Sequence, residues 1–69
     1  MLAEVKLRVV VDRRDIIVTQ PGSAWVAVYF KPDRQPHLVA KDAPVGPQDF
    51  TTRAWRAAVV KARGLGWIA

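Results

Sequence analysis

The sequence predicts an α+β fold, a three- to four-stranded antiparallel β-meander with one C-terminal helix packed on one face. Three observations favour this architecture. Apolar residues alternate with other residues in short runs before residue 42, as in strands that are half buried on a sheet. Short turn-forming segments separate these runs, so neighbouring strands pair antiparallel. After residue 46 good helix formers dominate instead.

Four short strands are expected, at about residues 4–12, 15–20, 23–31 and 37–41. The first is rich in alternating β-branched valines. The four consecutive charges of 12–15 interrupt the apolar pattern and indicate a turn. Pro21-Gly22 indicates the next turn, because proline presets φ and glycine accepts a positive φ. Pro32 cannot donate a ladder hydrogen bond and is expected to end the third strand.

One helix is expected over about residues 47–63, followed by an apolar tail at 64–69. Pro47 suits the first turn, where its missing N–H costs nothing. Asp49 then lies near the positive end of the helix dipole. Gly64 is the expected C-terminal stop.

Length and composition restrict the classes of protein. The chain has 69 residues, a net charge of +5, one histidine and no cysteine. This indicates a single domain over 1–69, without a disulfide framework or a thiolate metal site. Since His37 alone cannot form a histidine cluster, we expect no metal and no cofactor. A domain this small buries only about 60% of its unfolded-chain surface, so a partner subunit is an option.

No targeting, membrane or catalytic signal is apparent. The longest apolar run, 24–30, is much shorter than a membrane-spanning helix, and the amino end does not resemble a secretory signal. A cytoplasmic protein without a membrane partner is therefore expected. The sequence shows no carboxylate pair, Ser/His/Asp set or phosphate loop, so we expect no enzymatic activity.

The helix can cover only one face of the sheet. Its apolar arc consists mainly of alanines, which allow close approach to the strands. Strand alternation predicts that the following residues lie on the face covered by the helix: Val5, Leu7, Val9, Val11, Ile16, Val18, Val26, Val28, Phe30, Leu38 and Ala40. The same alternation places these residues on the uncovered face: Lys6, Arg8, Val10, Ile17, Thr19, Trp25, Tyr29, Lys31, His37, Val39 and Lys41. A one-residue slip in any strand would exchange its two sets.

The uncovered face combines aromatic and cationic side chains and is expected to lack acidic residues. The candidate functional residues on it are Lys6, Arg8, Trp25, Tyr29, Lys31, His37 and Lys41. Self-association through this face is the main hypothesis, since aromatic and aliphatic side chains are natural interface residues. The alternative is nucleic-acid binding, with aromatics stacking on bases and cations neutralising phosphates. A third possibility is structural: Trp25 and Tyr29 fill the space under the alanine-lined helix.

Two further features leave alternatives open. Arg53, Arg56 and Arg63 form a stripe on the helix that could contact phosphates or could be its solvated side. Trp67 and Ile68 are expected to fold back onto the sheet or helix, with docking into a second subunit as the alternative.

Two resemblances add to this interpretation. From Pro21 onward the chain resembles short hypothetical proteins of alphaproteobacteria, in the segments PGSAWVAVYFKP, HLVAKD and DFTTRAWRAAVVKARGLGWIA. This resemblance implies bacterial origin and a self-contained domain, and it brings no activity or functional residues. Trp25-Val26-Ala27 and the helix alanines Ala54, Ala57 and Ala58 are faintly similar to three-strand-plus-helix DNA-binding domains of tyrosine integrase arms and plant ethylene-response factors. A shared order of elements does not by itself assign that function.

Overall fold

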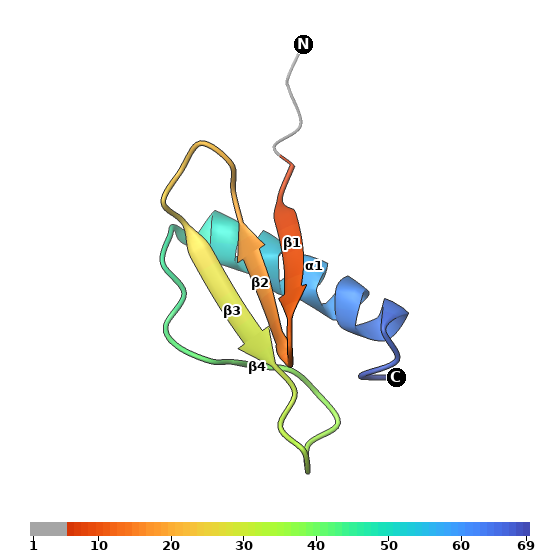
Figure 1. Ribbon diagram of the computed structural model, residues 1–69. Coiled ribbons are helices and arrows are strands. Elements are labelled where there is room, and N and C mark those ends of the chain that lie inside the picture. The colour runs from red at the N-terminus through yellow and green to blue at the C-terminus, as the bar shows by residue number, and fades with distance from the viewer. Residues whose placement is uncertain (1–5) are drawn as a thin grey trace.

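The computed structural model describes residues 6–69 and confirms the predicted fold class (Figure 1). Four antiparallel strands form one open sheet in the order β1-β2-β3-β4, and one C-terminal helix follows. The elements are β1 (Arg8–Asp12), β2 (Asp15–Thr19), β3 (Val26–Phe30), β4 (Val39–Ala40) and α1 (Gln48–Gly64). The start of the expected first strand, with Val5, lies outside the described residues.

β1 and β2 form a hairpin with a two-residue turn. Asp12 pairs with Asp15, so Arg13 and Arg14 make up the whole connection. Arg13 has a φ of +57°, because two-residue hairpins favour turns with positive φ at their central positions. Glycine, asparagine or aspartate usually occupies such a position, so an arginine here is unusual.

The chain after β3 returns along the free side of that strand. β4 itself has only two residues, which pair with Tyr29 and Phe30. Beyond it, the Lys41 N–H donates to the Val28 carbonyl at 2.9 Å. Val26 and Val45 then exchange backbone hydrogen bonds of 3.0 and 2.9 Å. β3 is therefore paired on both sides along much of its length, whereas β1 forms the open edge of the sheet.

Helix α1 crosses one face of the sheet and lies behind it in Figure 1. Three alanines at helical spacing, Ala54, Ala58 and Ala62, are fully buried against the strands. Their small side chains allow close approach, and larger residues supply the remaining volume. The buried core cluster comprises Ile16, Val18, Ala27, Tyr29, Leu38, Phe50, Ala54, Ala58 and Ala62.

The helix ends one step later than the sequence indicated. Gly64 is still helical, and the glycine with positive φ is Gly66, at +79°. The Gly66 N–H donates to the Arg63 carbonyl and the Trp67 N–H to the Ala62 carbonyl, which together form a Schellman motif. The helix thus ends at Gly64, near the expected stop, but the glycine whose positive φ terminates it is Gly66. The motif turns the chain so that Trp67 packs against the core together with Ile68, as the fold-back hypothesis predicted.

The predicted faces of β3 were also wrong, by one residue. Register pairs Tyr29 with Ile16 and Ala27 with Val18, and all four side chains are buried under α1. Consequently Val26, Val28 and Phe30 face away from the helix, and the first two strands keep their predicted faces.

The physical reason for this reversal is the volume left above the alanines. The Tyr29 ring meets Trp55 edge to face at a centroid distance of 5.4 Å. The ring centroids of Trp25 and Phe50 lie 5.8 Å apart in the same layer. Aromatic side chains fill a gap that valines would leave partly empty, and close packing is what stabilises an interior. The structural hypothesis for Trp25 and Tyr29 is thus the one the geometry supports.

Candidate functional site

The face of the sheet opposite α1 is uncovered and largely apolar. Val10, Ile17 and Val28 lie side by side on three neighbouring strands, in direct cross-strand register. Phe30 and Val39 form a second pair on the same face. The apolar members of this open face are Val10, Ile17, Val26, Val28, Phe30, Val39 and Val45. Val10 and Val45 are 42% and 54% exposed, so the apolar surface reaches solvent at both sides of the sheet.

On β1 and β2 the charges of the open face lie at the two strand ends and not in the middle, whereas Lys41 follows β4 beside Val28. Arg8 pairs with Thr19 at one end. Asp12 and Asp15 face each other at the opposite end. Lys41 Nζ donates to Asp15 Oδ2 at 2.9 Å, which neutralises one of the two acids. The open face therefore has a cationic end, an apolar centre and an acidic end.

The Lys41–Asp15 pair also shifts the Lys41 titration. The side-chain hydrogen bond to Asp15, and then the Coulombic attraction of that carboxylate, raise the pKa of Lys41 above its ordinary value. Lys41 thus stays protonated over the whole physiological range.

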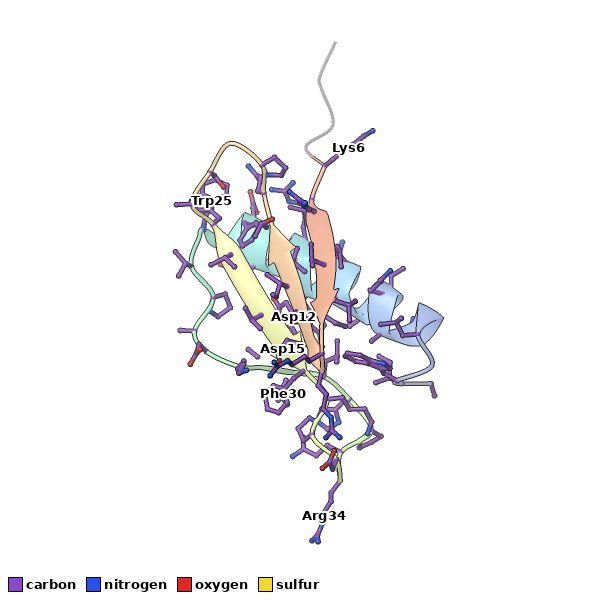
Figure 2. The ribbon with its side chains drawn as sticks, in the orientation of Figure 1. Lys6, Asp12, Asp15, Trp25, Phe30 and Arg34 are labelled. Carbon is purple, nitrogen blue, oxygen red and sulfur yellow. The ribbon has the colours of Figure 1, made fainter. Side chains whose placement is uncertain are left out.

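The structure does not bring the seven predicted face residues together. Lys6 lies beyond the Arg8 end of β1, whereas Lys31 and His37 follow strand β3 at the other end of the sheet. Figure 2 shows Lys6 and Trp25 toward one end of the molecule and Asp12, Asp15 and Phe30 toward the other. Of the predicted set, only Arg8 and Lys41 lie within the strand register of the open face.

Two further expectations for this face are wrong: the predicted aromatics Trp25 and Tyr29 are not on it, and it carries acidic residues. Trp25 and Tyr29 lie on the helix side, and Tyr29 is 3% exposed. Burial raises the pKa of the Tyr29 hydroxyl, since its ionised form would lose hydration. Asp12 and Asp15 occupy the open face because the charged turn begins and ends on that side of the sheet.

Two of the three helix arginines make hydrogen bonds to other parts of the chain. Arg53 Nη2 donates to Gln20 Oε1 at 3.2 Å, and its Nε donates to the Asp49 carbonyl at 3.3 Å. Arg53 therefore joins the helix to the end of β2. Arg63 Nε donates to the Ala69 carbonyl at 3.3 Å, so it binds the segment after the helix. Arg56 is exposed.

An apolar groove runs between the β1 edge and α1. It has a volume of about 390 Å³ and is lined by Val9, Arg56, Ala57, Val60 and Lys61. Val60 is 68% exposed, the highest value for a large apolar side chain within residues 6–69. This groove is the second apolar surface of the molecule and lies at the edge of the sheet, not on its open face.

Sequence reasoning missed a cationic pocket at the β1–β2 turn. Its volume is about 360 Å³, and Arg13, Arg14, Lys31, Asp33 and Trp67 line it. The signals that could have revealed it are the paired arginines of the turn and the tryptophan of the C-terminal segment. Their proximity depends on the Schellman turn at Gly66, which was not predicted from the sequence.

The described residues contain neither a metal centre nor a membrane-spanning element. Within residues 6–69, no three His, Asp or Glu side chains are grouped so that they could hold a metal ion. The only helix in this part of the chain, α1, is too short and too polar to cross a lipid bilayer.

Comparison with known proteins gives no relative for this chain: no family model, curated protein or solved structure matches it. The resemblances to alphaproteobacterial proteins and to DNA-binding domains therefore stay predictions.

Proposed function

We propose that the protein is a non-enzymatic assembly module that self-associates by packing the open sheet faces of two copies together. The observation that carries the proposal is the row of Val10, Ile17 and Val28 across three strands on a face that nothing in the described chain covers. A bacterial origin, which the sequence resemblance implies, and a cytoplasmic location are both part of the proposal.

The small core supports the need for a second copy. The largest fully buried side chains are Phe50, Ile16 and Val18, and the helix contributes mainly alanines to the interior. Burial of apolar surface contributes about 25 cal/mol per Å², so covering a second sheet face adds a stabilising term that one copy lacks. A face-to-face pair of sheets is a common solution for two such apolar surfaces.

Charge complementarity selects the relative orientation of the two copies. If the strands of the copies ran in the same direction, Arg8 would meet Arg8 and the acidic ends would meet each other. With the strands running in opposite directions, Arg8 of each copy approaches Asp12 of the other. Opposite charges across an interface fix register and disfavour wrong pairings. We therefore propose a two-fold dimer with antiparallel strand directions.

Nucleic-acid binding by the open face is less well supported than self-association. Asp12 and Asp15 would repel a phosphate backbone at one end, and Lys41 is engaged by Asp15. The face also lacks Trp25 and Tyr29, the two aromatics on which that hypothesis relied. Its apolar centre fits another apolar surface better than it fits a polyanion.

Two matched substitutions test the proposal. Val28→Lys places a charge in the centre of the open face, whereas Val60→Lys makes the same change in the groove beside β1. Sedimentation velocity over a micromolar concentration series measures association, and circular dichroism verifies the fold of each variant. We expect the wild type and Val60→Lys to dimerise and Val28→Lys to stay monomeric.

Two results would contradict this proposal. A wild-type chain that sediments as a monomer at all these concentrations would exclude self-association. Loss of the dimer in Val60→Lys, with retention in Val28→Lys, would move the interface to the β1 edge and overturn the open-face assignment.

A further inference from the structure

The cationic pocket is built from three segments that are distant in the sequence. Arg13 and Arg14 come from the β1–β2 turn, Lys31 and Asp33 follow β3, and Trp67 follows the Schellman turn of α1. Three cations against one carboxylate give the lining a local excess of two positive charges; Asp12 and Asp15 flank the two arginines on the open face and do not line the pocket. The pocket uses no residue of the open-face row, so it is independent of the proposed dimer interface.

The carboxylate of Asp33 does not prevent the cations of the pocket from binding an anion. Arg14 Nη1 contacts Asp33 Oδ1 at 3.2 Å, with side-chain exposures of 82% and 84%. Such an exposed ion pair contributes little to stability and is readily exchanged for another anion. Arg13 has no carboxylate partner among the described residues, and Lys31 Nζ donates only to the adjacent Pro32 carbonyl, at 3.4 Å.

The backbone at Arg13 is the second observation that points to a ligand. Arg13 is the only non-glycine residue with a positive φ in the described chain. Such a conformation is strained for an arginine, and glycine would relieve it in this turn. Strained residues cluster at binding sites, where a side chain is kept for what it contacts and not for the stability of the fold. At Arg13 this side chain is a guanidinium, and it lines the same pocket as Trp67.

Trp67 supplies the other half of the recognition chemistry. It is half buried against the core and also lines the pocket. A second hollow of about 560 Å³ continues past it along Arg34, Gln35 and Pro36. Indole rings stack on nucleobases, and guanidinium groups bind phosphate oxygens in a bidentate manner. The lining therefore offers a flat apolar surface next to phosphate-binding groups.

We infer that this pocket binds a nucleotide unit, with the base against Trp67 and the phosphate between Arg13, Arg14 and Lys31. The shared chemistry is a phosphate close to an aromatic base, supplied either by a free nucleotide or by one unit of a single strand. The continuation toward Arg34 provides space for neighbouring units of a strand, and Figure 2 shows Arg34 at the far tip of that loop.

The test measures binding of a short fluorescein-labelled oligothymidylate by fluorescence anisotropy, at several salt concentrations. Thymidine monophosphate and inorganic phosphate serve as competitors. Arg13→Gly removes the guanidinium and relieves the strained turn, and Arg56→Gln removes one charge from the exposed helix as a matched control. Thermal unfolding of both variants accompanies the titrations.

We expect binding that weakens as salt rises. Arg13→Gly should weaken it at least about tenfold, because a charge-assisted hydrogen bond is lost. The slope of log affinity against log salt should decrease by about 0.7 in this variant, one phosphate contact of a single strand. Its melting temperature should equal or exceed that of the wild type, which a merely structural role of Arg13 would not produce. Arg56→Gln should leave both affinity and slope nearly unchanged.

The competitors identify the source of the nucleotide unit. Displacement of the probe by thymidine monophosphate at similar nucleotide concentration supports a free nucleotide, and displacement by unlabelled oligothymidylate alone supports a single strand. Absence of binding at low salt would overturn the inference. An equal loss of affinity in Arg56→Gln would also overturn it, because binding would then depend on the overall positive charge and not on the pocket. So would competition by inorganic phosphate as strong as that by the nucleotide, because Trp67 would then have no role in binding. Val28→Lys should bind as the wild type does, so this inference and the dimer proposal fail separately.

Discussion

At the scale of single residues, Gly46 shows how closely the loop before α1 approaches the aromatic layer. It has a φ of +143°, and a Cβ there would lie 2.7 Å from Phe50 Cδ2 and 3.0 Å from Trp25 Cγ. Both ring systems are packed against the core, so neither can move aside easily. Gly64, within α1, has no atom within 4 Å of the corresponding position.

These two glycines give a matched pair of substitutions with opposite expected signs. Gly46→Ala should lower the free energy of unfolding by at least about 1 kcal/mol, from backbone strain and the close contacts. Gly64→Ala should raise it by about 0.5–1 kcal/mol, because alanine loses less backbone entropy in a helix. Urea denaturation measures both values. A neutral Gly46→Ala would show that the loop does not pack on Phe50 and Trp25 as described.

At the scale of elements, the sequence predicted which segments form strands and which forms the helix. It did not predict which face of strand β3 is buried. Alternation placed β1 and β2 correctly, because their outward positions include charged residues that mark one face, such as Arg8 and Asp12. In β3 both alternating sets are apolar, so period-two reasoning cannot choose between them. Tertiary packing decides: the buried alanines of α1 require bulk, and Tyr29 provides it.

The site was harder to predict than the fold for the same reason. The predicted interface depended on the face of β3, and that face depends on packing that is not local in sequence. The pocket beside Trp67 depends on the Schellman turn at Gly66, which places a residue from the C-terminal segment near a turn more than fifty positions away. Single-residue signals such as Pro47, by contrast, act locally: the sequence put it in the first turn of the helix, and the structure has it one position earlier, at the N-cap.

The contact between β3 and α1 predicts alkaline instability. Burial raises the pKa of Tyr29 in the folded state above its unfolded value, so the unfolded chain releases this proton first as pH rises. Stability is unaffected below the unfolded pKa of about 10 and falls above it. The Lys41 pKa is raised too, so its pairing with Asp15 is fully present below the unfolded pKa and is lost as pH rises through the folded one.

Tyr29 is the only tyrosine in the chain, so tyrosinate absorbance reports this group alone. We expect its titration midpoint to lie above that of a model tyrosine and to coincide with loss of the circular dichroism signal. In Tyr29→Phe, titration of Lys41 still contributes, and alkaline unfolding should become shallower. A normal tyrosine midpoint in a folded protein would refute the burial of Tyr29 under α1.

At the scale of the whole molecule, charges of opposite sign lie at the two ends of strand β1. Arg8 and Asp12 lie at opposite ends of β1, both on the open face. This separation is what gives the proposed dimer a preferred direction. A cationic end and an acidic end on one apolar face can be satisfied together only when the two copies run in opposite directions.

A charge exchange tests that orientation. Arg8→Glu should weaken the dimer by increasing repulsion with Asp12 of the other copy, and Asp12→Arg should do the same with Arg8. The double variant should recover much of the lost affinity, since each copy again presents one end of each sign. Sedimentation equilibrium at low salt measures the dimerisation constants of the three variants against that of the wild type. Additive losses in the double variant would contradict the antiparallel orientation.

The most direct test of self-association through the open face is an isotope-filtered nuclear Overhauser experiment on a mixture of ¹³C-labelled and unlabelled protein. It detects only contacts between copies. We expect intermolecular cross-peaks from the methyl groups of Ile17 and Val28, at the centre of the open face. Intermolecular cross-peaks confined to Val9 and Val60 at the β1 edge, or none at protein concentrations well above the micromolar range, would contradict it.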